Sequence, residues 1–254
     1  MADENNAYSF TTAATQQVTL RPGSAGFKMW RGESLPEVTL AYESWGELSP
    51  AADNAIIIFT GLSPSAHAAS SAQDSSPGWW EYMVGPGKAI DTDRFFVVCA
   101  NSLGGCYGST GPISINPTSG KRYGADFPDV TVEDIAQSGY LLMRELGVRN
   151  LHAAVGSSMG GMSSIAYAMQ YPGEIDYLIS ISAATSALPL TIALRSLQRE
   201  IIRSDPAWND GQYDDDNKPL SGMSLARKLG LVSYRAADEW NSKFDRARLP
   251  AEKL

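Results

Sequence analysis

The sequence predicts an α/β protein whose central sheet is mostly parallel and carries helices on both faces. Apolar runs with the composition of buried strands alternate along the chain with segments of helical composition. Strands joined through helices form parallel sheets with right-handed crossovers, so their carboxyl ends share one edge, where ligands bind. The predicted strands are 54–60, 95–100, 151–155 and 177–181, and the predicted helices between them are 131–146 and 159–171. The first of these helices starts with the capping-box-like Thr131-Val132-Glu133-Asp134.

The composition of the chain is that of an ordinary globular protein. It has 254 residues, of which 43% are hydrophobic and 19% are charged, which is enough for one large core. The formal net charge of −8, without a local cluster of Lys and Arg, argues against a nucleic-acid surface. No apolar run reaches the roughly 18 residues of a membrane span, and residues 1–17 lack the features of a signal peptide. We therefore expect a cytoplasmic protein that binds neither nucleic acid nor membrane.

The chain before the first buried strand is predicted to hold one small antiparallel unit. Residues 1–25 are expected to form a flexible tail. Residues 26–30 and 38–45 have strand-like composition and flank the turn-prone segment 32–36. This arrangement predicts a hairpin.

Two loops that leave the carboxyl ends of predicted strands are expected to matter for function. Strand 54–60 ends in Gly61-Leu62-Ser63-Pro64 and leads to segment 78–88, where two tryptophans stand among glycines. Large rings beside glycines favour a packed, shaped loop. Strand 95–100 continues into 101–124, which is rich in Gly, Ser and Pro. Loops of that length inside a compact domain are usually functional.

The stretch after strand 151–155 has the pattern of a nucleophile elbow. It reads Gly156-Ser157-Ser158-Met159-Gly160, a G-x-S-x-G motif between a strand and a helix. The motif alone also occurs in plain turns, but the flanking strand and helix favour the elbow. Ser158 is therefore expected to stand exposed at the carboxyl end of its strand. The N–H groups and the dipole at the start of the next helix favour negative charge there.

Beyond residue 184, strand-like segments cease. Helical composition over 188–204, 223–229 and 236–244 predicts a helical lid inserted over the sheet. The predicted organisation is thus a tail at 1–25, a core at 26–184 and a lid region at 185–254. In the first of these helices, arginines recur every four residues, at Arg195, Arg199 and Arg203. This spacing places them on one face of the helix, which could simply be exposed to solvent. The acidic run 214–216 lacks the ligand spacing of a metal site, so we expect a hydrated loop there and no metal.

Several motifs spread over the chain resemble those of one family. They are Gly78-Trp79-Trp80, residues 85–94, Gly108-Ser109-Thr110-Gly111-Pro112, Asn116-Pro117, residues 156–162 and Ala226-Arg227. On these residues the chain resembles the homoserine/serine O-acyltransferases of the α/β-hydrolase superfamily, from about Phe27 to Leu249. The loop 61–69 and the helical segment 195–200 are most similar to the serine O-succinyltransferase branch. The resemblance implies an α/β-hydrolase fold with a helical lid.

The resemblance also implies an acyltransferase of cysteine or methionine biosynthesis. Ser158 would take a succinyl or acetyl group from acyl-CoA, a co-substrate, and hand it to the hydroxyl of L-serine or L-homoserine. The backbone N–H groups of Leu62 and Met159 would form the oxyanion hole. Arg227 would bind the amino-acid carboxylate, unless it is an ordinary surface arginine, and we hypothesise that Arg195 selects succinyl over acetyl. The resemblance implies no cofactor, and relatives that pair through their lid helices suggest a homodimer.

The chain departs from this family in the rest of the catalytic triad. In this fold the residues follow in the order Ser, Asp, His, and no histidine follows Ser158. His152 lies six residues before Ser158 on the same strand, which is roughly 20 Å away at about 3.3 Å per residue. His67 lies just beyond the oxyanion loop, on the wrong side of the site for a base. Because family members extend past Leu254, we expect a truncated piece without the final strands that bear the Asp and the His.

Other functions stay open at this point. The G-x-S-x-G motif equally suits an esterase-type serine hydrolase on the same fold. A chain that lacks the triad Asp and His could also be an inactive remnant. The residues do not decide between L-serine and L-homoserine as acceptor, nor between succinyl and acetyl as the transferred group.

Overall fold

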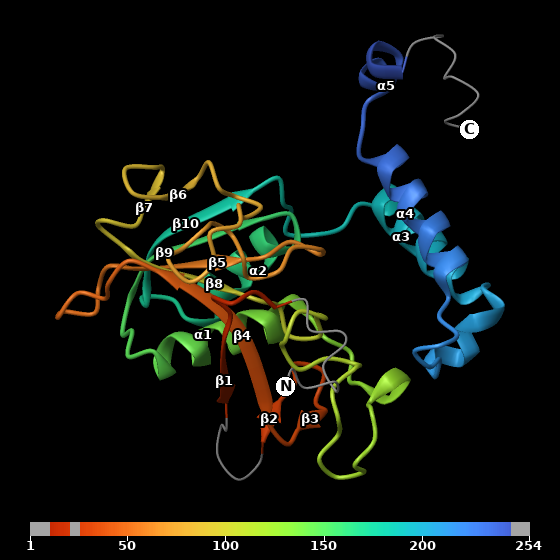
Figure 1. Ribbon diagram of the computed structural model, residues 1–254, viewed down its shortest axis with the longest axis horizontal. Helices are drawn as coiled ribbons and strands as arrows, with labels where there is room; N and C mark the ends of the chain where they lie inside the picture. Colours follow the sequence, from red (N-terminus) through yellow and green to blue (C-terminus); the bar gives the residue numbers. More distant parts are fainter. Residues whose placement is uncertain (1–10, 21–25, 245–254) are drawn as a thin grey trace. The chain divides into compact units, whose positions relative to one another are not determined.

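The computed structural model of the chain describes residues 11–20 and 26–244. The chain divides into two compact units, Met1–Thr185 and Ser186–Leu254, and the division lies one residue from the boundary that the composition predicts. The first unit holds a six-stranded sheet, whereas the described part of the second unit is helical (Figure 1).

The central sheet has the spatial order β1-β4-β8-β5-β9-β10. Strands β8, β5, β9 and β10 are parallel to one another, while β1 and β4 are antiparallel additions. The prediction of a mostly parallel sheet is confirmed, and strands form at all four predicted positions, although the side chains of β10 are mostly exposed. The strands are β1 (Gln16–Leu20), β4 (Val38–Trp45), β5 (Ala55–Phe59), β8 (Phe96–Ala100), β9 (Leu151–Ser157) and β10 (Ile175–Ile181).

The amino-terminal strands pair differently from the prediction. Residues 38–45 do form a strand, β4, but its antiparallel partner is β1, which lies in the segment predicted to be a tail. Strand β2 (Phe27–Lys28) pairs with β3 (Ser34–Leu35), so the predicted hairpin between 26–30 and 38–45 is wrong. Strand β1 is short, lies at the sheet edge and has mainly exposed side chains, and such a strand carries little apolar signal in the sequence.

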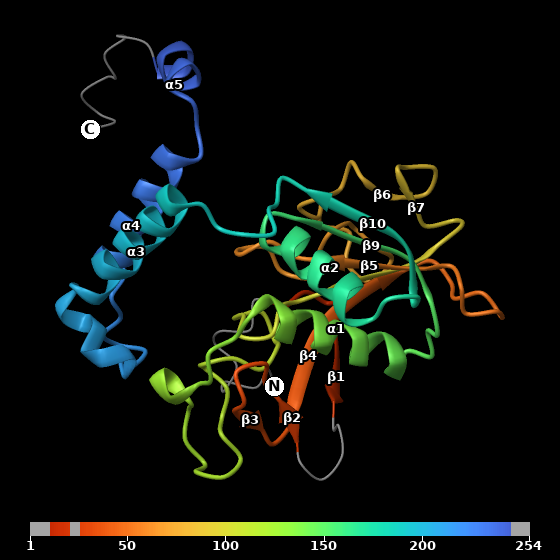
Figure 2. The same ribbon diagram turned by 180° about the vertical axis from the view of Figure 1, so that it is seen from behind.

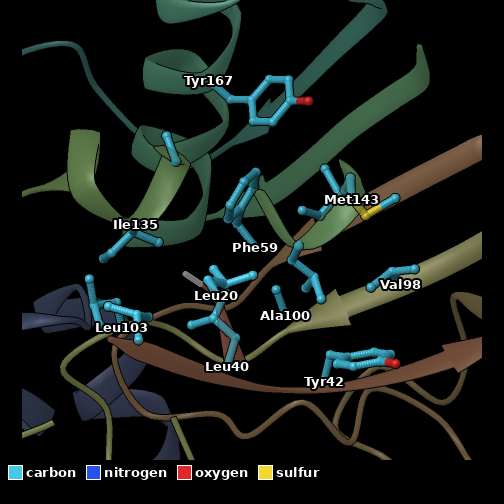
Figure 3. Packing of buried hydrophobic residues seen from close by; sticks show 14 of the residues in the cluster. Leu20, Leu40, Tyr42, Phe59, Val98, Ala100, Leu103, Ile135, Met143 and Tyr167 are labelled. Carbon is cyan, nitrogen blue, oxygen red and sulfur yellow. The ribbon is translucent and has the colours of Figure 1, made fainter. Parts of the chain in front are cut away.

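Two helices, α1 (Val132–Glu145) and α2 (Met159–Gln170), pack on one face of the sheet (Figure 2). Their apolar side chains, among them Ile135 and Tyr167, join those of the strands in the larger core (Figure 3). On the opposite face the strand side chains pack against loop residues, including Trp80. Within the described residues of the first unit, a loop therefore covers the face on which further helices were predicted.

The start of α1 is a capping box, as predicted. The Oγ1 of Thr131 accepts a hydrogen bond from the N–H of Asp134, and the Asp134 carboxylate accepts one from the N–H of Thr131 (2.8 Å). Asp134 also accepts from the N–H of Trp30 (2.6 Å), which ties the amino-terminal segment to the helix. The helix ends before Gly147, whose φ of 81° suits the left-handed position after a helix.

The described part of the second unit consists of helices, as predicted. They are α3 (Pro189–Arg203), the 3₁₀ segment η2 (Pro206–Gly211), α4 (Leu220–Ser233) and α5 (Ala237–Phe244). Helices α3 and α4 approach closely, since a Cβ at Gly222 would stand 2.8 Å from the carbonyl oxygen of Ile201. Whether this unit acts as a lid stays a prediction.

Three short elements lie in the loops of the first unit. Strand β6 (Val84–Gly85) pairs with β7 (Ile90–Asp91), and η1 (Gly124–Asp126) ends the long loop after β8. Across residues 11–20 and 26–244, no helix combines the length and the apolar composition needed to cross a membrane.

Candidate active site

Ser158 occupies the sharp turn between β9 and α2, as the sequence predicts. Its φ of 56° and ψ of −121° fall in a region that residues with a side chain rarely adopt, and its side chain is exposed. The N–H of Ser158 donates to the carbonyl oxygen of Ile181 at the end of β10 (3.0 Å). This bond holds the backbone of the turn against the neighbouring strand, so the conformation of Ser158 is set by the fold.

The two glycines of the motif are required by close backbone contacts. A Cβ at Gly156 would stand 2.2 Å from the carbonyl carbon of Gly160. A Cβ at Gly160 would stand 2.0 Å from the carbonyl oxygen of Phe59, at the end of β5. Larger residues would push the start of α2 away from both strands. The glycines thus bring the serine, the helix start and the end of β5 together.

The residues predicted to supply main-chain donors lie on either side of this contact. Met159 is the first residue of α2, so its N–H has no acceptor within the helix. Leu62 follows β5 in a loop that starts beside the elbow, because a Cβ at Gly61 would lie 3.6 Å from the carbonyl oxygen of Ser157. The side chain of Leu62 is 71% exposed, so only its backbone is suited to act in the site.

The loop that carries Leu62 is held by the tryptophan segment that follows it. The Nε1–H of Trp79 donates to the carbonyl oxygen of Ser65 (3.0 Å), and the N–H of Trp80 donates to that of Ala68 (2.8 Å). Glycine is required at position 78, where a Cβ would stand 2.2 Å from the carbonyl carbon of Ala68. The predicted packed loop is therefore confirmed, and its contacts explain the Gly78-Trp79-Trp80 motif.

The carboxylate of Glu81 ties the tryptophan segment back to the loop after β5. It accepts hydrogen bonds from the N–H of Ser70 (2.7 Å), the hydroxyl of Ser70 (2.9 Å) and the N–H of Gly78 (3.0 Å). The hydrogen bond from the Ser70 backbone, followed by that from Gly78, lowers the pKa of Glu81 to about 2. The loop is thus tied to an ionised carboxylate at neutral pH.

Neither histidine is placed to act as the base for Ser158. The Nδ1 of His67 lies 2.9 Å from the Glu43 carboxylate and its Nε2 lies 2.9 Å from the carbonyl oxygen of Ser76, so both ring nitrogens already have partners. His152 lies near the start of β9, half-buried, with its ring stacked on Phe95 at 4.7 Å. His152 is thus a half-buried residue at the opposite end of β9 from Ser158, as its place in the sequence predicts.

Buried hydroxyl groups join the strand ends at this edge, and only that of Ser109 belongs to a motif quoted for the family resemblance. The Oγ1 of Thr60 lies 3.1 Å from the Oγ of Ser102, which links the ends of β5 and β8. The Oγ of Ser109 donates to the carbonyl oxygen of Asn101 (2.9 Å) and accepts from the N–H of Ala41 (3.0 Å). Serine and threonine in a loop form no pattern that reveals such partners, because the contacts are far apart in sequence.

The two predicted substrate-binding arginines lie in the second unit. Arg195 on α3 is half-buried, with its guanidinium 5.2 Å from the ring centroid of Tyr234 and its Nη1 2.5 Å from Oε1 of Gln198. The amide of Gln198 donates in turn to the carbonyl oxygen of Ala226 (2.9 Å), next to Arg227 on α4. Arg227 is exposed. Gln198 therefore links the side chain of Arg195 to the backbone of α4, next to Arg227.

Comparison with known proteins gives a consistent set of relatives. A family model described as the alpha/beta hydrolase fold matches residues 54–254. The serine O-succinyltransferase of Litchfieldella anticariensis is 58% identical over 87% of this chain and 60% of its own length. The serine O-succinyltransferase of Frateuria aurantia is 55% identical over 89% of this chain and 62% of its own length. The chain therefore spans about three fifths of the length of these curated relatives.

Two kinds of solved structure are similar to this chain. The homoserine O-acetyltransferase from Bacillus anthracis superposes with a TM-score of 0.84 at 30% identity, over 94% of this chain and 65% of its own. Esterase E22 superposes with a TM-score of 0.83 at 32% identity, over 93% of this chain and 67% of its own. The predicted resemblance to the homoserine/serine O-acyltransferases is confirmed by these matches.

Proposed function

This chain belongs to the α/β-hydrolase fold family, and from that premise we propose that it carries the acyl-accepting serine of a serine O-succinyltransferase. The observation that supports this most directly is the exposed Ser158 at a positive φ, beside Met159 and the loop that bears Leu62. The names of the relatives at 55–58% identity favour succinyl as the transferred group and L-serine as its acceptor.

The proposed reaction has two half-reactions that share one hydroxyl. The Oγ of Ser158 attacks the thioester carbonyl of succinyl-CoA and loses its proton to a base, and CoA leaves as the protonated thiol. The N–H groups of Leu62 and Met159 stabilise the negative charge that develops on the carbonyl oxygen. The hydroxyl of L-serine then attacks the acyl-enzyme, the product ester leaves, and Ser158 regains its proton. Ping-pong kinetics follow from this sequence.

The base in this scheme is neither His67 nor His152. Both ring nitrogens of His67 already have other partners, and His152 is stacked on Phe95 near the far end of β9. The Asp and the His of the triad stay a prediction. A homodimer and a cytoplasmic location stay predictions of the same kind.

Arg195 and Arg227 are proposed to bind the two carboxylates of the substrates. Arg195 would pair with the succinyl carboxylate and Arg227 with that of L-serine, since a guanidinium forms bidentate pairs with carboxylates. We would compare acylation by succinyl-CoA and by acetyl-CoA in Arg195→Ala. The control is Arg199→Ala, which removes an exposed arginine of the same helix. An unchanged ratio of the two rates in Arg195→Ala would contradict the assignment.

The central experiment is mass spectrometry of a form of the protein that also carries the predicted triad Asp and His, mixed with succinyl-CoA. A succinyl adduct on the peptide that contains Ser158, absent in Ser158→Ala, is the expected result. Absence of the adduct in the unsubstituted protein would contradict the proposed function and favour an inactive remnant.

An esterase is the second candidate, supported by the close superposition with esterase E22. The two functions differ in where the acyl group goes after it leaves Ser158. Addition of L-serine should convert the adduct into O-succinylserine if the chain is part of a transferase. Release of free succinate at the same rate with and without L-serine would favour the esterase.

A further inference from the structure

A buried ion pair lies beneath the loop that carries Leu62. Glu43 on β4 is 1% exposed and His67 in the loop after β5 is 8% exposed, and their Oε2 and Nδ1 atoms are 2.9 Å apart. Neither residue is part of the proposed chemistry. Two ionisable side chains this deeply buried need a complete set of partners, since an unpaired charge there would be strongly destabilising.

The partners of the pair define its charge. The Nε2 of His67 lies 2.9 Å from the carbonyl oxygen of Ser76, and its Nδ1 faces the Glu43 carboxylate. A carbonyl oxygen and a carboxylate both accept hydrogen bonds, and the Ser76 hydroxyl, 3.2 Å from Nε2, donates its proton to Asp74. Both ring nitrogens therefore donate, and His67 is an imidazolium. The other carboxylate oxygen of Glu43 accepts from the hydroxyls of Thr12 (2.6 Å) and Thr15 (3.0 Å). The partners outside the pair come from residues 12–15 and from Ser76, and together they satisfy both side chains.

The surrounding charges favour the same protonation state. Burial opposes the charged form of His67, but the hydrogen bonds to Glu43 and Ser76 and the negative charges of Glu43 and Asp74 outweigh it, and the pKa of His67 is raised. Cys99, the partner of Glu43 across the sheet, stays a neutral thiol because burial raises its pKa. Glu43 and Asp74 are therefore the charges that face the imidazolium.

His67 also connects the pair to the backbone of the loop. Its carbonyl oxygen accepts from the N–H of Trp79 (3.2 Å), and its own N–H donates to the Oγ of Ser65 (3.3 Å). The ring of His67 is thus bonded to β4 and to Ser76, while its backbone is bonded to the tryptophan segment. The start of the loop at Gly61 lies against the elbow. Residues 62–66 are therefore held between two fixed points.

We propose that Glu43 and His67 are positioning residues, whose buried ion pair holds the loop so that the backbone N–H of Leu62 faces the acyl oxygen on Ser158. The proposal rests on the proposed function for the role of Leu62. A positioning role differs from a purely structural one in its kinetic consequence. Loss of the pair should slow the acyl transfer step without weakening the binding of the acyl donor.

The experiment compares single and double substitutions of the pair. His67→Gln and Glu43→Gln each leave one buried charge without its partner, which is strongly destabilising. The double variant E43Q/H67Q leaves no unpaired buried charge, so it keeps the test possible if the single variants do not fold. His152→Gln is the matched control, because His152 also lies beside a carboxylate, that of Asp176 at 3.9 Å, but near the start of β9.

Two measurements are made on each variant. The first is the rate of succinylation of Ser158, at saturating succinyl-CoA, together with the concentration that gives half the maximal rate. The second is amide hydrogen exchange of the peptide that contains Leu62. The second measurement needs no activity, so a failure of the proposed function is seen separately, as the absence of any adduct in the unsubstituted protein.

In His67→Gln we expect acylation up to about 100-fold slower, the loss typical of one oxyanion-hole donor, with half-saturation unchanged within about twofold. The Leu62 peptide should exchange faster in the same variant. E43Q/H67Q should recover part of both losses, and His152→Gln should show neither. The proposal is overturned if acylation in folded His67→Gln or in E43Q/H67Q matches the unsubstituted protein, or if exchange of the Leu62 peptide is unchanged.

Discussion

The backbone of Gly160 touches that of Phe59 so closely that a Cβ at position 160 would stand 2.0 Å from the Phe59 carbonyl oxygen. This contact sets the distance between the start of α2 and the end of β5. One carries Met159 and the other leads to Leu62. The relative position of the two proposed main-chain donors therefore depends on a residue without a side chain.

The first prediction concerns Gly160→Ala. The added methyl group must displace α2 from β5, and we expect a loss of about 1–3 kcal/mol in the free energy of unfolding, as for other overpacked sites. Acylation of Ser158 should fall with it. Gly61→Ala is the control for stability, because a Cβ there makes only ordinary contacts, at 3.6 Å or more. Equal denaturation midpoints for the two variants would contradict this prediction.

The second prediction concerns strain at Ser158. Its φ of 56° costs about 1–3 kcal/mol for a residue with a side chain. A glycine relieves that cost but adds about 0.5–1 kcal/mol of chain entropy in the unfolded state. Ser158→Gly should therefore stabilise the protein by up to roughly 2.5 kcal/mol, whereas Ser158→Ala should not, and both should lose the adduct. Urea titrations of the two variants test this, and a less stable Ser158→Gly would refute it.

The third prediction concerns the pH dependence of the Glu43–His67 pair. Because the pKa of His67 is raised in the folded protein above its ordinary value of 6.5, protonated His67 stabilises the folded state. This contribution is complete below pH 6.5 and is lost as the pH rises through the raised pKa. The difference in melting temperature between the unsubstituted protein and His67→Gln should shrink across that range. A difference that grows with pH would show the opposite sign of coupling.

The fourth prediction concerns Gln198, which joins α3 to α4. Gln198→Ala removes its bond to the carbonyl oxygen of Ala226 and frees the guanidinium of Arg195. We expect a loss of roughly 0.5–1.5 kcal/mol per lost hydrogen bond, seen as faster amide exchange in α4, and a weaker preference for succinyl-CoA over acetyl-CoA. Ser196→Ala, at an exposed position of the same helix, is the control. Exchange in α4 that is the same in both variants would count against this role.

Local patterns in the sequence were sufficient for much of the fold. The apolar run before Ser158 and the small residues after it predicted β9, the elbow and α2. Thr131 and Asp134 predicted the start of α1 from their spacing alone. In each of these cases the residues that form the structure are neighbours in the chain, so their spacing carries the information.

Other features depended on residues that lie far apart in sequence. The partner of β4 is the edge strand β1 rather than 26–30, because the sheet buries β4 between β1 and β8. Glu43 was not singled out at all, since a lone acid in a strand gives no signal until the fold brings His67 to it. The loop with Trp80 covers a sheet face for which helices were predicted, because its packing is specified by tertiary contacts.

The sequence by itself determined where a nucleophilic serine would stand and which family the chain resembles, because both depend on short motifs. Only the tertiary structure decided that His67 is half of a buried ion pair. A side chain takes its protonation state from the groups around it, and in His67 those groups come from β4, from Ser76 and from the charge of Asp74.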